Sequence, residues 1–331
     1  IATTGRRGPV LIDLPMNIQR SEVENPVYDM TFEDKHTDAA AAQQAADTIL
    51  EALEQAKRPV IMLGHGVDSS FSQQKLIRFA QKRQIPIITS VLAKSVLGYD
   101  HPLNFGCIGG AYGHRYANMI ANAKSDLLLC FGISLCTRQI GTKVHEFARG
   151  AKIIRIDIDP YNLQRDIHEN GINEVKLQAE TGAVIDCFAK VDDPDIEGVS
   201  DWLNVCTEIK ENLQAVDDAT PERYPNRMIA DLSDMLEDTS AIAVDVGQHM
   251  VWSYQSFKNH EGQKLLFSGG HGAMGYGLPA AIGAYYATGK PTACICGDGA
   301  LQMNIQELEW VKRENLPVKI MVDRKSTRLN S

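Results

Sequence analysis

The sequence predicts an α/β protein with two doubly wound parallel-sheet domains and one remaining strand of a third domain. Continuous apolar runs of strand length alternate with segments of helical spacing, a pattern typical of parallel sheets covered on both faces. A polar stretch at residues 191–224 separates two such series. A further apolar run near the start has no partner strand close to it in the sequence.

That first run, residues 9–14, ends at Pro15 and is predicted to be one buried strand. Residues 17–37 are polar and rich in breakers, so the sheet of this strand is expected upstream of the chain. We therefore assign residues 1–20 to the end of a preceding domain. Because the chain has no starting Met, we expect it to be a fragment.

The first doubly wound domain is expected over residues 38–190. Its Ala- and Leu-rich segments have helical spacing, and its strands are short and apolar. Predicted helices are 39–57 and 70–83, and predicted strands are 59–64, 86–89, 126–132 and 152–159.

The second domain is expected over residues 191–322. Predicted helices are 200–215, 275–287 and 301–313, and predicted strands are 241–246, 292–296 and 318–322. Small residues in the second helix suit close packing. The third helix is expected to bury one face, formed by Leu301, Ile305, Leu308 and Val311.

The composition excludes several classes of protein. The 331 residues include 33 Lys and Arg against 42 Asp and Glu, a net charge of −9, which argues against a nucleic-acid partner. No apolar run reaches the roughly 18 residues that span a bilayer, and the first residues lack a signal peptide core. The seven cysteines contain no Cys-x2-Cys pair, so we expect reduced thiols, no zinc site and a cytoplasmic location.

The strongest chemical signal is the turn Gly297-Asp298-Gly299, which lies between a predicted strand and a predicted helix. The start of a helix offers free N–H groups and a positive dipole end to an anion. An aspartate there adds one hard oxygen ligand for Mg²⁺ that can bridge to phosphate. The turn therefore indicates a diphosphate–Mg²⁺ site, the alternative being that Asp298 is only a helix N-cap.

Two further segments favour the diphosphate site. Residues 245–249 follow another strand, and residues 268–279 form a glycine-rich loop that leads into a helix. Junctions of this kind converge at the carboxyl edge of a parallel sheet, where ligands bind.

Together these residues resemble the thiamine-diphosphate enzymes, and most closely the acetolactate-synthase-like members. The resemblance extends over nearly the whole chain and is most specific at residues 303–308 and 315–319. It implies that Asp298 is the Mg²⁺ ligand and that Met274 is an apolar wedge that bends the cofactor. The alternatives are that His249 is a satisfied surface or core histidine, the more frequent case for a histidine on its own, and that Met274 is ordinary core packing. The cofactor-binding residues that it implies are Val246, Gly247, Gln248, His249, Gly272, Ala273, Met274, Gly297, Asp298, Gly299 and Ala300.

The implied function is a carboligase that condenses a pyruvate-derived hydroxyethyl unit with a second 2-keto acid. The glutamate that activates the cofactor would precede Ile1 and act across a subunit interface, so a homodimer or homotetramer is implied, with a regulatory small subunit left open. Alternatives are another thiamine-diphosphate decarboxylase or lyase, or an inactive cofactor-binding fragment.

The sequence departs from the family at two places. In acetolactate synthases the middle domain holds FAD, but of the family's charged run after Gly132 only Arg138 remains, so FAD binding stays open. Residues 323–331 differ from the expected Leu-Asn-Asn continuation and are predicted to be a non-native tail. The residues that would contact FAD are Gly64, His65, Gly66, Gly132, Arg138 and Asp157.

Overall fold

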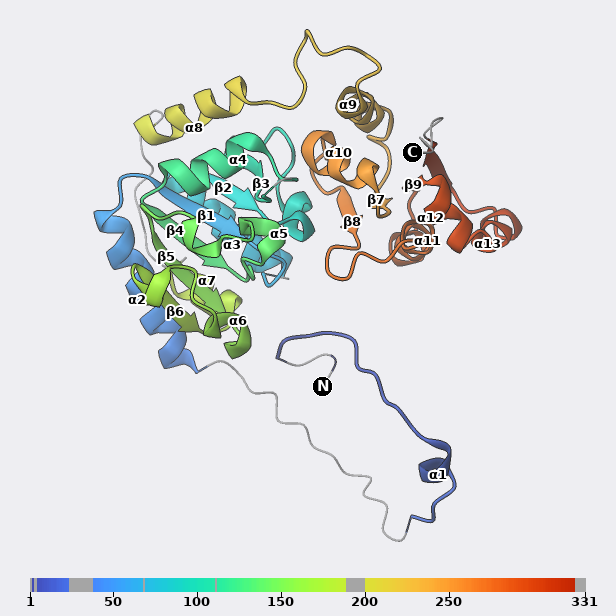
Figure 1. The fold of residues 1–331 in the computed structure, drawn as a ribbon, viewed down its shortest axis with the longest axis horizontal. Helices are drawn as coiled ribbons and strands as arrows, with labels where there is room; N and C mark the ends of the chain where they lie inside the picture. Colours follow the sequence, from blue (N-terminus) through green and yellow to red (C-terminus); the bar gives the residue numbers. More distant parts are fainter. Residues whose placement is uncertain are drawn as a thin grey trace.

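Two parallel sheets organise the molecule (Figure 1), and each has its own apolar core. The computed structural model describes residues 2, 5–23, 38–67, 69–110, 112–188 and 200–324. The predicted α/β class with two parallel-sheet domains is confirmed. None of the helices within these ranges combines the length and the apolar character that crossing a membrane requires.

The first sheet has six strands in the order β3-β2-β1-β4-β5-β6. The winding therefore reverses between β1 and β4, which creates a crevice at their carboxyl ends. The predicted segments correspond to β1, β2, β4 and β5. The edge strands β3 and β6 lack a continuous apolar run and are not predicted. The strands are β1 (Pro59–Leu63), β2 (Ile87–Thr89), β3 (Asn104–Cys107), β4 (Leu127–Phe131), β5 (Lys152–Asp157) and β6 (Glu174–Gln178).

Helices cover both faces of this sheet. Helices α2 and α7 pack against each other, whereas α4 packs against α8 (Asp201–Asn212) and lies above β2 and β3 in Figure 1. The Asp38 carboxylate caps α2 by accepting a 2.9 Å hydrogen bond from the backbone N–H of Ala40. The helical elements are α2 (Ala39–Gln55), α3 (Ser70–Lys82), η1 (Val91–Val96), α4 (Arg115–Met119), η2 (Ile120–Lys124), α5 (Thr137–Ile140), η3 (Val144–Glu146), α6 (Pro160–Gln164), η4 (Glu169–Gly171) and α7 (Thr181–Phe188).

Helix α8 packs into the core of the first sheet. Its buried side chains include Trp202, whose Nε1–H donates a 2.9 Å hydrogen bond to the backbone oxygen of Pro59. From the sequence, this helix is expected to belong to the second domain. We propose instead that the boundary follows α8, because the apolar face of α8 is buried against the first sheet.

The second sheet has four parallel strands in the order β10-β9-β7-β8. Ile242 and Val244 pack on the side of α9 and α10, whereas Ala243 packs on the side of α11, as the alternation of a strand requires. The predicted strands correspond to β7, β9 and β10, and the helix expected at 275–287 is α11. The elements are α9 (Pro225–Met235), β7 (Ala241–Val244), α10 (Gln248–Ser256), β8 (Lys264–Phe267), α11 (Gly277–Thr288), β9 (Thr292–Gly297), α12 (Asp298–Met303), α13 (Glu307–Arg313) and β10 (Val318–Asp323).

Two predictions about local structure are wrong. Residues 9–14 form no strand and lie exposed, with Leu11 at 94% exposure, because no strand of the described part of the chain pairs with them; they precede the single turn α1 (Met16–Gln19). Residues 301–313 form two helices, since α12 ends before Asn304 and α13 begins at Glu307. Ile305 lies in this break and is exposed, so it does not belong to the buried face.

The two sheet units contact each other through η1 and the loop after α10. The Asn259 Nδ2–H donates a 2.9 Å hydrogen bond to the backbone oxygen of Leu97, and the N–H of Tyr99 donates a 2.8 Å bond to the backbone oxygen of Asn259. Val91 packs against the core between the second sheet and α9 and α10. A Cβ on Gly269, just after β8, would lie 2.6 Å from Cδ2 of Leu92 in η1, so the carboxyl end of β8 lies beside the first unit.

Candidate cofactor site

Three segments meet at the carboxyl edge of the second sheet. Residues 245–247 follow β7, residues 297–299 begin at the last residue of β9, and these two strands are neighbours in the sheet. The third segment, residues 268–276, leads into α11, which packs on both strands. The structure thus brings the three predicted junctions together, as the parallel arrangement requires.

Asp245 connects the first of these segments to the third. Its buried carboxylate accepts hydrogen bonds from the backbone N–H groups of Val246 (2.7 Å), Gly275 (3.0 Å) and Gly277 (2.7 Å). The sequence analysis does not select Asp245 as a site residue. An acidic residue directly after a buried strand, with a glycine loop later in the same unit, is the signal that could have found it.

The glycine-rich loop is held from two more sides. Gly275 has φ of +84°, a conformation that favours glycine, and its backbone oxygen accepts a 2.6 Å hydrogen bond from Asn304 Nδ2. A Cβ on Gly275 would lie 2.8 Å from that nitrogen. At the other end, Ser268 Oγ accepts a 3.1 Å hydrogen bond from the N–H of Ala273. The loop is therefore fixed in shape by contacts within its own unit.

Met274 extends from this loop towards the start of α12. Its Cε lies 3.7 Å from the position that a Cβ on Gly299 would occupy, and 44% of the residue is exposed. Gly272 has φ of +75° and lies in the same loop, beside Ala273. An exposed thioether above a glycine turn is unusual for a core residue, so this arrangement favours the role of a wedge over ordinary packing.

Asp298 is the first residue of α12 and is exposed. Its Oδ1 accepts a 2.9 Å hydrogen bond from the N–H of Gly299. The described residues contain no group of three or more His, Cys, Asp or Glu side chains placed to hold a metal. The single exposed carboxylate of Asp298 fits Mg²⁺, because this ion binds through one or two carboxylates together with phosphate oxygens and waters. Ala300, behind this turn, is buried.

His249 turns inward rather than towards solvent. It is 2% exposed, and its Nδ1 lies 3.5 Å from Oδ2 of Asp323 at the end of β10. A Cβ on Gly247 would clash with the imidazole ring, and one on Gly297 would lie 3.4 Å from its Cε1. Burial lowers the pKa of His249, an effect that the Asp323 carboxylate opposes. His249 therefore lies beneath both junctions, whereas Gln248 is exposed and Val246 half-buried.

The residues predicted to contact FAD do not all come together. Gly64, Gly66 and Gly132 meet at the reversal point between β1 and β4, where the N–H of Gly66 donates a 3.0 Å bond to the backbone oxygen of Gly132. A Cβ on Gly64 would overlap the Gly132 oxygen. His65, between the first two glycines, is exposed.

Asp157 and Arg138 lie elsewhere. Asp157 ends β5 and accepts hydrogen bonds from the N–H of Asp159 (2.9 Å) and from Asn162 Nδ2 (3.2 Å). Arg138 instead reaches the glycine-rich loop of the second unit, and its Nη1 donates a 3.4 Å bond to the backbone oxygen of Gly270. The structure therefore places a guanidinium from the first unit beside the glycine-rich loop of the candidate cofactor site.

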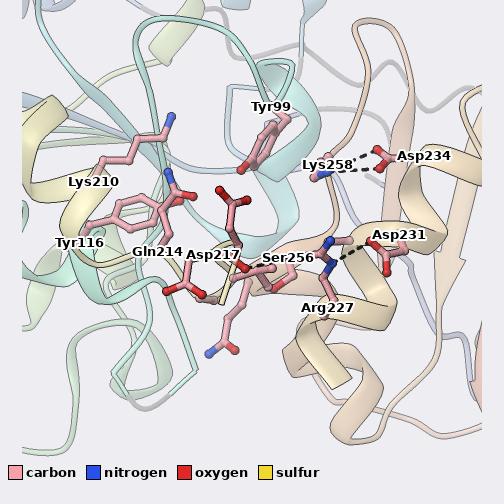
Figure 2. A pocket seen from close by; sticks show the side chains of 15 residues that line it. Tyr99, Tyr116, Lys210, Gln214, Asp217, Arg227, Asp231, Asp234, Ser256 and Lys258 are labelled. Atoms are coloured by element: carbon pink, nitrogen blue, oxygen red, sulfur yellow. Dashed lines mark hydrogen bonds and ion pairs between the residues drawn. The ribbon is translucent and has the colours of Figure 1, made fainter. Parts of the chain in front are cut away.

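A separate cavity of about 340 Å³ lies between the two units and is lined by none of the predicted site residues (Figure 2). Its charged side chains are largely compensated. Lys258 lies 3.3 Å from Asp234, and Arg227 lies 3.1 Å from Asp231. Lys210 Nζ donates a 2.9 Å bond to the backbone oxygen of Asn104. Two of the cations in the lining are therefore paired with carboxylates of the same lining.

Comparison with known proteins agrees with the geometry. Residues 46–186 match the thiamine pyrophosphate enzyme central domain, and residues 245–324 match the thiamine pyrophosphate enzyme C-terminal TPP binding domain. The chain is 32% identical to a probable acetolactate synthase large subunit of Methanococcus aeolicus, 34% to acetolactate synthase 1, chloroplastic, of Oryza sativa subsp. japonica, and 31% to the acetolactate synthase isozyme 2 large subunit of Escherichia coli. Each alignment covers 97% of this chain but 56%, 50% and 56% of the relative, respectively, so the chain spans about half the length of these relatives.

Proposed function

Because this chain belongs to the thiamine pyrophosphate enzymes, we propose that its full-length protein is an acetolactate synthase large subunit that acts on 2-keto acids. The observation that carries this proposal is the meeting of the Asp298 turn with the glycine-rich loop at one sheet edge. The relatives named acetolactate synthase, from an archaeon, a plant and a bacterium, support it.

Residues of two junctions would hold the diphosphate and its Mg²⁺. The carboxylate of Asp298 would bind the metal, and the backbone N–H groups of Gly299 and Ala300 at the start of α12 would donate to phosphate oxygens, the Gly299 N–H in exchange for its bond to Asp298 Oδ1. Gly247 and Gln248, at the start of α10, would form the opposite side of the cradle. His249 would support both sides from below, since its ring touches both junctions.

Met274 would position the rings of the cofactor. It is exposed at the site and lies over Gly299, so an apolar ring system can rest on its thioether. When bound, thiamine diphosphate supplies a nucleophilic carbon and an electron sink for the decarboxylation of one 2-keto acid and the transfer of the remaining unit to a second. The guanidinium of Arg138 suits a carboxylate substrate, because arginine binds planar carboxylates in a fixed geometry.

A flavin dinucleotide is a second candidate ligand, for the first unit. The reversal of winding between β1 and β4 favours a dinucleotide in the crevice above Gly64 and Gly132. Two observations argue against FAD binding. These glycines pack directly against each other, and Arg138 bonds the glycine-rich loop of the second unit instead of lying in this crevice. Purified full-length protein that is yellow, with flavin released on denaturation, would establish FAD. A colourless and fully active preparation would exclude a need for it.

Following the family resemblance, we propose a homodimer or homotetramer in the cytoplasm, to which a regulatory small subunit can bind. The word chloroplastic in the names of some relatives describes the location of those relatives only. Sedimentation of the full-length protein with and without cofactor would give the oligomeric state.

The decisive experiment compares full-length wild type with Asp298→Asn. The variant should lose about 100-fold in Mg²⁺-dependent thiamine diphosphate affinity, because a neutral amide replaces the one carboxylate ligand. Acetolactate formation from pyruvate should fall in parallel. Glu309→Gln is the matched control, since it removes an exposed carboxylate of the same unit and should leave both properties unchanged. Unchanged cofactor binding in Asp298→Asn would overturn the site, and a different product from pyruvate would overturn the assigned reaction.

A further inference from the structure

The cavity between the two units has hydroxyl groups and charges that the described residues leave without partners (Figure 2). Its walls come from α4 and α8 of the first unit, from the linker residues 214–218, and from α9 and the end of α10 of the second unit. Its volume of about 340 Å³ is in the range of sites that hold small molecules. The groups in these walls therefore indicate which class of ligand the cavity would take.

The buried hydroxyl of Tyr116 has no hydrogen-bond partner in the described part of the chain. Tyr116 belongs to α4, is 5% exposed and packs on the ring of His114, with 4.8 Å between the ring centres. Its phenol oxygen is nevertheless not sealed from solvent, so the surface that it keeps lies at the cavity. Because a buried hydroxyl normally has a partner, this group is available to donate to a ligand.

Tyr99 adds a second phenol from the same unit. Figure 2 shows Tyr99 and Tyr116 together in the cavity wall. Burial raises the pKa of Tyr116, and the nearby Tyr99 phenol raises it further. Burial also raises the pKa of Tyr99. Both phenols therefore keep their protons at neutral pH, and O–H donors of this kind bond most strongly to an ionised acceptor such as a carboxylate.

One cation and two carboxylates of the lining lack a charged partner among the described residues. The two ion pairs of the lining neutralise four other charged side chains. Lys210 differs from these, because its Nζ donates a 2.9 Å bond to a neutral group, the backbone oxygen of Asn104. On the linker, Asp217 accepts a 2.7 Å bond from the neutral hydroxyl of Thr220, and Asp218 is exposed. The unpaired charges thus have both signs.

We propose that this cavity binds a free α-amino acid with an apolar side chain. The carboxylate of the ligand accepts hydrogen bonds from Lys210, Tyr99 and Tyr116, and its ammonium group lies against Asp217 or Asp218. A zwitterion suits the lining better than a simple anion, because the carboxylates of the lining outnumber its cations. It also suits the lining better than an amine, because an amine offers no acceptor to the buried hydroxyl of Tyr116.

Such a ligand would connect the two units. Its carboxylate partners belong to the first unit, whereas its apolar side chain would lie against Val216 of the linker and Ala230 of α9. Because the cavity exists only when both units are folded and in contact, binding should raise the temperature of unfolding. None of the predicted cofactor residues lines the cavity, so binding should not require thiamine diphosphate.

The first test is isothermal titration calorimetry of full-length wild-type protein without thiamine diphosphate. Three probes with the same aromatic side chain are compared: L-phenylalanine, phenethylamine, which lacks the carboxylate, and 3-phenylpropanoate, which lacks the ammonium group. L-Phenylalanine should bind at least about tenfold more tightly than either analogue, because each analogue loses one charged contact. Absence of L-phenylalanine binding, or equal affinity for the three probes, would overturn the proposal. Tighter binding of 3-phenylpropanoate would show that the cavity takes simple anions and would also overturn it.

Variants place the binding in this cavity. Tyr116→Phe removes only the hydroxyl and should weaken L-phenylalanine binding about tenfold. The double variant Asp217→Asn with Asp218→Asn should weaken it by a similar factor and leave 3-phenylpropanoate binding no weaker than in wild type. Asp238→Asn is the matched control, because it removes an exposed carboxylate outside the cavity and should bind like wild type. Unchanged L-phenylalanine affinity in both cavity variants would place the binding elsewhere and overturn the proposal.

A parallel measurement separates this site from the proposed function. Thiamine diphosphate affinity, measured by equilibrium dialysis with Mg²⁺, should be the same in wild type, Tyr116→Phe and the double aspartate variant. Urea unfolding of Tyr116→Phe shows whether the variant is folded, and Tyr99→Phe provides a second hydroxyl deletion at a less buried phenol. Failure of the wild-type protein to bind thiamine diphosphate would overturn the proposed function and leave the result for L-phenylalanine valid.

Discussion

The carboxylate of Asp245 accepts a 2.7 Å hydrogen bond from the backbone N–H of Gly277, thirty-two residues later in the chain. It accepts further bonds from Gly275 and from its own neighbour Val246. One buried side chain thus fixes the glycine-rich loop against the end of β7. The shape of the candidate cofactor site depends on this contact, because Met274 directly precedes Gly275, one of the two glycines that Asp245 holds.

Asp245→Asn should destabilise the protein and weaken cofactor binding together. The amide offers one acceptor oxygen and places N–H donors against backbone N–H groups, a loss of about 1–3 kcal/mol. Urea unfolding and equilibrium dialysis of thiamine diphosphate measure the two effects. Asp298→Asn is the comparison variant. Because its side chain is exposed, it should change stability by no more than about 0.5 kcal/mol while it lowers the affinity for thiamine diphosphate. Equal stability of wild type and Asp245→Asn would contradict the role of this carboxylate.

Alanine at two glycines should have opposite effects on stability. In Gly64→Ala the new Cβ overlaps the backbone oxygen of Gly132, so the turns after β1 and β4 must separate at a cost of about 1–3 kcal/mol. In Gly283→Ala, inside α11, no atom lies within 4 Å of the new Cβ. Alanine also loses less backbone entropy than glycine when the chain folds. A gain of about 0.5–1 kcal/mol is expected. Thermal unfolding of both variants decides this, and a stable Gly64→Ala protein would show that the turns can separate freely.

The strands were predictable where a continuous apolar run decides burial by itself, as in β1, β4, β5 and β9. The misses depend on contacts between distant residues. Helix α12 ends before Asn304, whose side chain donates to the backbone oxygen of Gly275 in another loop. No periodicity in residues 301–313 carries that information.

The candidate site shows the same limit. The Gly297-Asp298-Gly299 turn and the glycine-rich loop were recognised from residue type and spacing. Asp245 was missed because its role comes from the folded position of Gly275 and Gly277. Arg138 was assigned to a ligand of the first unit, and only the packing of the two units shows that it reaches the backbone oxygen of Gly270.

Glu174→Gln should be strongly destabilising. Glu174 and Arg155 form a buried ion pair at 2.7 Å between β5 and β6, with 0% and 2% exposure of their side chains. The other carboxylate oxygen accepts a 2.9 Å bond from the N–H of Ile167. Removing one charge leaves the guanidinium buried without its counter-ion, a loss of about 3–5 kcal/mol.

Urea unfolding of the Glu174→Gln protein measures this loss, and an exposed pair is the matched control. Lys143 and Glu146 lie 3.3 Å apart in solvent, so Glu146→Gln should change stability by less than about 1 kcal/mol. The double variant Arg155→Met with Glu174→Leu should recover part of the loss, because neither charge is then buried alone. Equal effects of the two Glu→Gln changes would show that burial of the Arg155 pair adds nothing.

Below neutral pH, stability should decrease through His114. Burial lowers its pKa to about 3, and nearby Lys94 acts in the same direction. Its Nδ1 accepts a 2.9 Å bond from the N–H of Cys107, so the folded ring stays neutral while the unfolded ring takes up a proton below pH 6.5. The contribution of His114 to the free energy of unfolding is therefore complete above pH 6.5. It decreases as the pH falls towards 3, by at most about 1.4 kcal/mol per pH unit. Urea unfolding between pH 6.5 and 5 should show a smaller slope in His114→Gln than in wild type and in the exposed control His260→Gln, and parallel slopes would contradict the assignment.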